Sequence, residues 1–268
     1  MYDINRIFDG FKAFSQTEAI ALGGSRSTGL NDESSDYDVY VYLSAEIPET
    51  ERCDLLSRYC QVTEIGNHYW EYEDNCILNG GVPIDIIYRD MGSFDDGLRR
   101  TVTDCIPSNA YTTCMWHNLL NSEIIFDRTG SLAALKEKYR VPYPEKLREN
   151  IIRRGRQLLS GCIPSYDMQI KKAVQRGDSN AVTHRTTEFL ASYYDVIFAL
   201  NRLTHPGEKR LAEICAAKCG LLPNNFGENL DRLFAELYTE KTPENISRIV
   251  SELDAVIEKE KSKGGLKP

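Results

Sequence analysis

The chain has 268 residues, with 32 Lys and Arg against 40 Asp and Glu, and its formal net charge is −8. This acidic balance, without a run of basic residues, argues against nucleic-acid binding, which depends on Lys and Arg neutralising phosphates. No apolar run approaches the ~20 residues of a membrane span, and the N-terminus carries acids where a signal peptide needs bases, so we expect a cytoplasmic protein without a membrane partner.

The chain is expected to open with an amphipathic helix, because apolar residues recur at helical spacing: Ile4, Ile7, Phe8, Phe11 and Phe14. A short buried strand over residues 19–22 follows and ends at Gly23, Gly24 and Ser25. Glycines allow the backbone to approach an anion closely, and amides at a helix start bind phosphate oxygens. This turn, with Arg26 directly after it, is therefore a predicted phosphate site.

Residues 36–43 alternate like a strand with two different faces. One face carries only apolar and aromatic residues, and the other begins with Asp36 and Asp38. At ~3.4 Å per residue these two carboxylates project in parallel about 7 Å apart. Because carboxylate oxygens are the ligands of hard divalent cations, the pair predicts a magnesium site.

Further along, the pattern predicts a helix over 49–61, strands with turns over 62–81, and a strand over 82–90 with Asp85 in its middle. A carboxylate between isoleucines is costly to bury unless a cation is near, so we expect Asp85 to join the aspartate pair. In the preceding segment EYED, Glu71 is a candidate functional acid, while Glu73 and Asp74 are expected at the surface.

After Asp90 the strand signals fade, apart from one extended segment within residues 121–139. From Pro144 onward the pattern is helix after helix. We therefore expect an α+β domain over 1–143, with a mixed sheet flanked by helices, followed by an all-helical domain over 144–268.

The residues Gly24-Ser25, the spaced Asp36-Tyr37-Asp38 and the later Asp85 together resemble the signature of the nucleotidyltransferase superfamily, which includes DNA polymerase β and antibiotic nucleotidyltransferases. The resemblance covers roughly residues 19–89. More loosely, the helical half resembles the helical domain of bacterial aminoglycoside adenylyltransferases.

This resemblance implies two-metal nucleotidyl transfer. Asp36, Asp38 and Asp85 would bind two Mg²⁺ ions, while Gly24, Ser25 and Arg26 would bind the phosphates of ATP or another nucleoside triphosphate. The acceptor would be a small molecule bearing a hydroxyl group, possible acceptors including antibiotics. Similar adenylyltransferases carry a general base near a tryptophan, which matches Trp70-Glu71, so the choice of base between Glu71 and Asp85 is open.

In the helical half the resemblance implies that Lys209 reaches the triphosphate, although the Pro-Gly-Glu-Lys stretch around it is also an ordinary helix start. Glu188 faces either the acceptor pocket or solvent. The basic group Arg148, Arg153, Arg154 and Arg156 is expected on an exposed helix face.

A second class of function stays open beside the enzyme: a binding or regulatory module with this fold, resembling antitoxin-like proteins that act through a partner. The intact set of three acids favours catalysis. The sequence does not determine the oligomeric state.

Overall fold

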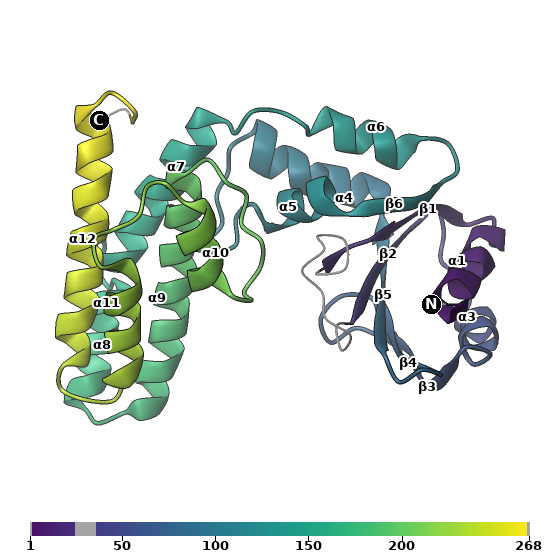
Figure 1. Ribbon diagram of the computed structural model, residues 1–268, viewed down its shortest axis with the longest axis horizontal. Coiled ribbons are helices and arrows are strands. Elements are labelled where there is room, and N and C mark those ends of the chain that lie inside the picture. The colour runs from purple at the N-terminus through teal and green to yellow at the C-terminus, as the bar shows by residue number, and fades with distance from the viewer. Residues whose placement is uncertain (1, 25–35, 267–268) are drawn as a thin grey trace. The chain divides into compact units, whose positions relative to one another are not determined.

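A computed structural model describes residues 2–24 and 36–266. The chain forms two compact units (Figure 1), one from Met1–Arg99 with Asn118–Val141 and the other from Arg100–His117 with Pro142–Pro268. Helix α5 (Cys114–Asn121) contributes residues to both. The division into domains 1–143 and 144–268 stays a prediction, and the compact units assign the Arg100–His117 segment to the helical part.

Among the described residues, the first unit contains one six-stranded mixed sheet with the order β3-β4-β5-β2-β1-β6. Strands β2 and β5 run parallel, while every other pair of neighbours is antiparallel. The strands are β1 (Thr17–Leu22), β2 (Tyr37–Leu43), β3 (Cys60–Asn67), β4 (Glu73–Leu78), β5 (Pro83–Asp90) and β6 (Glu123–Asp127).

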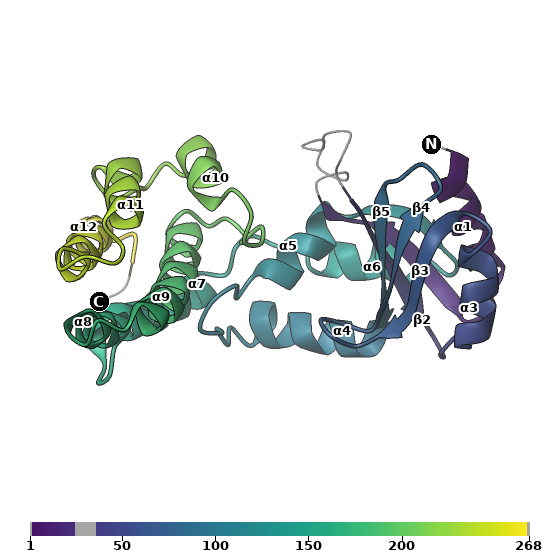
Figure 2. The same ribbon diagram turned by 90° about the horizontal axis from the view of Figure 1, so that it is seen from below.

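Helices α1 (Tyr2–Ala13) and α3 (Glu49–Leu56) cover one face of this sheet, as Figure 2 shows. Their apolar residues pack with Val39, Val41, Ile84 and Ile86 in one buried core. The predicted helix over 49–61 ends earlier, because Cys60 already pairs with Leu78 as the start of β3. Strand pairing here overrides the helical pattern.

The opposite face of the sheet carries the polar residues of the same strands, since side chains alternate along a strand. Asp38 of β2 and Asp85 and Arg89 of β5 lie on this face. The unit is completed by α4 (Met91–Leu98) and α6 (Ser131–Lys138).

The second unit is helical. Its main elements are α7 (Glu145–Arg156), α8 (Tyr166–Gln175), α9 (Ser179–Leu200), α10 (Leu211–Lys218), α11 (Phe226–Ala235) and α12 (Thr242–Ser262), with π-helical segments at Arg99–Thr103 and Gln157–Gly161. Helix α9 is buried along its second half, where α7 packs against it, and α8 runs beside it (Figure 1). The predicted α+β architecture with a helical C-terminal region is confirmed. None of the described helices is long and apolar enough to cross a membrane.

The expectation that Arg148 lies on an exposed helix face is wrong, because its side chain is fully buried. Its guanidinium donates hydrogen bonds to the carbonyl oxygens of Ala199 (3.2 Å) and Leu200 (3.0 Å) at the end of α9. The last carbonyls of a helix lack partners within the helix. Arg148 therefore caps α9, whereas Arg153 and Arg154 are exposed as expected.

Candidate functional site

The three predicted metal ligands come together on the polar face of the sheet. Because β2 and β5 are parallel neighbours, Asp38 lies directly opposite Asp85 in the register, and Asp36 precedes β2 by one residue. One carboxylate oxygen from each of the three acids lies within 4.8 Å of the others, and all three residues are half-buried. Opposite ligands of one octahedral Mg²⁺ are about 4 Å apart, so this arrangement suits a hard divalent cation.

The glycines before β2 form the wall next to these acids. Gly23 donates its backbone N–H to the carbonyl oxygen of Asp38 at 2.8 Å. Gly24 has φ +63, and a Cβ there would lie only 1.8 Å from Oδ2 of Asp38. Glycine is thus required by both conformation and space. The predicted phosphate ligands Ser25 and Arg26 lie outside the described residues.

Asp85 is held by an amide from the neighbouring strand. Asn75 of β4 stands opposite Asp85 in the antiparallel register and donates from Nδ2 to Oδ1 of Asp85 at 2.7 Å. Oδ1 of Asn75 in turn accepts a hydrogen bond from Nδ2 of Asn67 on β3. No sequence pattern singles out these asparagines, because their contacts depend on the register of three strands.

Glu71, the candidate base, is bound by a buried arginine. Arg89 donates to both carboxylate oxygens of Glu71, at 3.1 and 3.4 Å, and to Oδ1 of Asn118 at 3.0 Å. Its guanidinium stacks 4.0 Å from the ring centre of Tyr40, whose hydroxyl accepts from Asn118 at 2.7 Å. Burial raises the pKa of Tyr40 to about 12. The neutral ring of Tyr40 and the charged guanidinium of Arg89 therefore form a cation–π pair on the face of the sheet that carries the acids.

Glu73 and Asp74 are not surface acids as expected. Glu73 is 5% exposed and lies on the acid face, where it pairs with Ile87 and is the diagonal neighbour of Asp85. Burial, and then the charges of Asp85 and Glu71, raise the pKa of Glu73. Such a shift is typical of acids that exchange protons in a reaction, so Glu73 is a functional candidate that the sequence did not single out.

Asp74 is fully buried on the other face of the sheet and is structural. It forms an ion pair with Arg52 of α3 and accepts hydrogen bonds from the backbone of Gly66 (2.8 Å) and the hydroxyl of Tyr88 (2.6 Å). Asp74 directly follows Glu73 in the chain. Because side chains alternate along a strand, the two acids lie on opposite faces of the sheet.

The candidates of the helical unit are exposed. Lys209 precedes α10, and Glu188 lies on α9, where the hydroxyl of Tyr166 donates to its Oε2 at 3.4 Å. Both contacts with substrate stay predictions.

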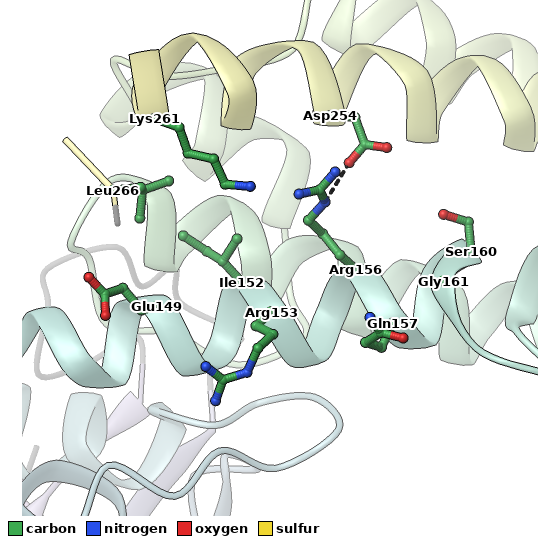
Figure 3. Close-up of a pocket in the computed structure, with 10 residues that line it drawn as sticks. All are labelled: Glu149, Ile152, Arg153, Arg156, Gln157, Ser160, Gly161, Asp254, Lys261 and Leu266. Carbon is green, nitrogen blue, oxygen red and sulfur yellow. Dashed lines mark ion pairs between the residues drawn. The ribbon is translucent and has the colours of Figure 1, made fainter. Parts of the chain in front are cut away.

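The helical unit also contains a hollow of ≈ 400 Å³ between α7 and α12 (Figure 3). Arg156 projects into the space between these helices and pairs with Asp254 at 2.7 Å. Arg153 and Lys261 add positive charge, and Glu149 adds negative charge. Lys209 and Glu188 are not among its lining residues.

Residues 4–108 match the family model of the nucleotidyltransferase domain, and residues 111–211 match a domain of unknown function (DUF4037). The predicted resemblance to the nucleotidyltransferase superfamily is thereby confirmed for the sheet-bearing part of the chain. None of the curated proteins matches the sequence significantly.

Similar solved structures include a nucleotidyltransferase-like protein from Exiguobacterium sibiricum, with 14% identity, 98% of this chain and 76% of that chain covered, and a TM-score of 0.43. An aminoglycoside 6-adenyltransferase from Bacillus subtilis has 8% identity, coverage of 95% and 90%, and a TM-score of 0.29. The tRNA-bound CCA-adding enzyme from Thermotoga maritima has 12% identity, coverage of 95% and 79%, and a TM-score of 0.28. Similarity at this level does not transfer residue roles.

Proposed function

We propose that this chain, a transferase with a nucleotidyltransferase domain, moves a nucleoside monophosphate to a hydroxyl group of a small-molecule acceptor in the presence of Mg²⁺. The favoured donor is ATP, so that AMP is transferred and pyrophosphate is released. The observation that carries this proposal is the meeting of Asp36, Asp38 and Asp85 within 4.8 Å on two neighbouring parallel strands.

The donor set fits magnesium, since three carboxylates supply only oxygen ligands and their half-burial leaves room for substrate oxygens. Asp36, Asp38 and Asp85 would hold the ions. When bound, Mg²⁺ would neutralise the negative charge that develops on the triphosphate during transfer.

We assign phosphate binding to the glycine turn and to two positively charged side chains, Arg26 and Lys209. The bare backbone at Gly24 allows close approach of an anion next to Asp38, and Ser25 and Arg26 follow it directly. From the helical unit, Lys209 is proposed to contact the triphosphate. These residues orient the α-phosphorus so that the acceptor oxygen attacks in line with the leaving pyrophosphate.

The attacking hydroxyl must lose its proton as its oxygen bonds to the α-phosphorus. Asp85 is a proposed metal ligand and Glu71 is engaged by Arg89 through both oxygens, which leaves each poorly suited to accept this proton. We therefore assign proton acceptance to Glu73, which is buried on the same face.

This assignment predicts that Glu73→Gln lowers the rate of pyrophosphate release by about 10²–10⁴-fold and leaves ATP affinity intact, whereas Glu71→Gln has a smaller effect on that rate. An unchanged rate in Glu73→Gln would return the role to Glu71 or Asp85.

The small-molecule acceptor is inferred from the net charge of −8, which disfavours a polynucleotide in the site. An antibiotic hydroxyl is one acceptor of this class. Screening hydroxyl-bearing compounds for pyrophosphate release, with single-stranded RNA as the competing acceptor, tests this point, and preferential extension of RNA would contradict it.

The metal and nucleotide sites are tested by thermal unfolding with ATP, with and without Mg²⁺. A ligand that binds the folded state alone at 100 times its Kd stabilises that state by about 2.7 kcal/mol. We expect Mg²⁺-dependent stabilisation of the natural chain and of Asp54→Asn, a control on the exposed side of α3, and none of Asp38→Asn. Stabilisation that persists in Asp38→Asn would place the nucleotide elsewhere.

A further inference from the structure

A directional chain of amide hydrogen bonds leads from the β3–β4 turn to Asp85. It begins at the backbone N–H of Tyr69, which donates to Oδ1 of Asn67 at 3.4 Å. Nδ2 of Asn67 donates to Oδ1 of Asn75, and Nδ2 of Asn75 donates to Oδ1 of Asp85 at 2.7 Å. Each amide thus accepts on the side of the turn and donates on the side of the acids.

The direction of this chain has a physical origin. A backbone N–H is a donor only, so the amide of Asn67 must present its oxygen to Tyr69 and its nitrogen to Asn75. The same orientation then passes to Asn75, which presents a donor to Asp85. A donor directed at a carboxylate stabilises the ionised form and fixes the orientation of the group.

Strand formation alone does not account for these residues. Asparagine is depleted in strands, yet Asn67 and Asn75 occupy neighbouring strands and contact one another. Both are half-buried, so water does not fully substitute for the contacts between their amides. Two asparagines at these positions are therefore better explained by the group at the end of the chain, Asp85.

We propose that Asn75, oriented by Asn67, is a positioning residue that holds the Asp85 carboxylate in place as a metal ligand. This inference rests on the proposed function, in which Asp85 binds Mg²⁺. The hydrogen bond occupies Oδ1 of Asp85 and so restrains the carboxylate, one oxygen of which lies within 4.8 Å of oxygens of Asp36 and Asp38.

The test is Mn²⁺ affinity, measured by titration calorimetry on the full chain without nucleotide. Loss of a partner that orients a metal-ligating group typically lowers metal affinity by about 10–100-fold. We expect this loss in Asn75→Leu, which has a similar size but no donor. Gln61→Leu removes an exposed amide from β3 outside the chain of hydrogen bonds, and its affinity should equal that of the natural chain.

A second variant, Asn67→Asp, tests the direction and keeps both strands polar. An added carboxylate near the site would by charge alone tighten Mn²⁺ binding. The chain of hydrogen bonds predicts the opposite, because the carboxylate of Asn67→Asp can only accept a hydrogen bond. If the Asn75 amide turns its nitrogen toward residue 67, its oxygen then faces Asp85 and the donor to Asp85 is lost. If the Asn75 amide keeps its orientation, its oxygen faces the new carboxylate at residue 67 and is repelled by it. The chain of hydrogen bonds therefore predicts weaker Mn²⁺ binding in Asn67→Asp.

The outcomes separate the two proposals. If the natural chain does not bind Mn²⁺, the metal site of the proposed function is wrong. If the natural chain binds Mn²⁺, Asp85→Asn weakens binding, and Asn67→Asp binds as tightly as the natural chain or more tightly, the positioning role is overturned. Should Asn75→Leu fail to fold, Asn67→Asp decides alone.

Discussion

At the level of single residues, the backbone at Gly24 lies so close to the Asp38 carboxylate that no side chain fits between them. A methyl group at this position would meet Oδ2 of Asp38 at 1.8 Å, and φ +63 adds backbone strain of roughly 1–2 kcal/mol for any residue with a Cβ. We predict that Gly24→Ala displaces the Asp38 carboxylate and weakens Mn²⁺ binding at least tenfold, as measured by calorimetry.

Gly81 supplies the matched control for this substitution. It also has positive φ, +82, but nothing lies within 4 Å of a Cβ there. Gly81→Ala should therefore cost similar stability and leave metal affinity unchanged. Equal Mn²⁺ affinity in both variants would show that the approach of Gly24 to Asp38 does not shape the site.

Single residues also show where sequence reasoning succeeds. The meeting of Asp36, Asp38 and Asp85 was predictable for two reasons. Strand alternation places Asp36 and Asp38 on one face. A lone acid such as Asp85 in an apolar strand is costly to bury unless a cation is near. Glu73 and Asp74 were not distinguishable in the same way. Their surroundings depend on Arg52 and on the register with β5, and neither is visible in the segment EYED.

At the level of elements, α3 is tied to the sheet by a buried ion pair. Arg52 binds Asp74, donates to the hydroxyl of Tyr72 at 2.6 Å, and donates to the carbonyl of Ile47 at 3.1 Å. Removing one member of a buried pair leaves an uncompensated charge and costs about 3–5 kcal/mol. We predict a loss of this size in the unfolding free energy of Asp74→Ala, measured by urea denaturation.

The corresponding double variant distinguishes the charge from the packing. Arg52→Leu with Asp74→Ala removes both charges, so its unfolding free energy should fall by less than the sum of the two single effects. Strict additivity would mean that the two side chains do not interact.

Helix α9 is tied to the segment Arg100–His117 through a buried acid. Asp195 accepts hydrogen bonds from the backbone N–H (3.0 Å) and hydroxyl (2.6 Å) of Thr112. Burial raises the pKa of Asp195 from 3.8 to about 6, so the folded chain keeps this proton at a pH where the unfolded chain has lost it. Its contribution to stability is therefore full below about pH 4 and declines as pH rises to about 6.

This sign gives a pH-dependent prediction for Asp195→Asn. The variant lacks the titration, so its unfolding free energy relative to the natural chain should rise between about pH 4 and pH 7 by about 3 kcal/mol. Urea denaturation at several pH values measures the difference. A constant difference would mean that Asp195 titrates alike in the folded and unfolded states.

At the scale of the whole molecule, the sequence was sufficient for the architecture because the signals are long and periodic. The alternating pattern of the strands comes first in the sequence and corresponds to the sheet of the first unit. The amphipathic pattern of the later helices corresponds to the second unit. The place of Arg100–His117 was not predictable, since this segment joins the helical unit through contacts such as Thr112 with Asp195, which lies 83 residues away. Contacts of this range leave no local pattern.

The central claim is that Asp36, Asp38 and Asp85 hold the metal ions of a nucleotidyl-transfer site. Its most direct test is anomalous scattering from crystals grown with Mn²⁺ and an ATP analogue that cannot be cleaved between the α- and β-phosphates. We predict a Mn²⁺ peak bound by oxygens of Asp36 and Asp38 and of the analogue's phosphates, with Asp85 at the same centre. A peak bound by other residues, or an analogue bound away from these acids, would contradict the account.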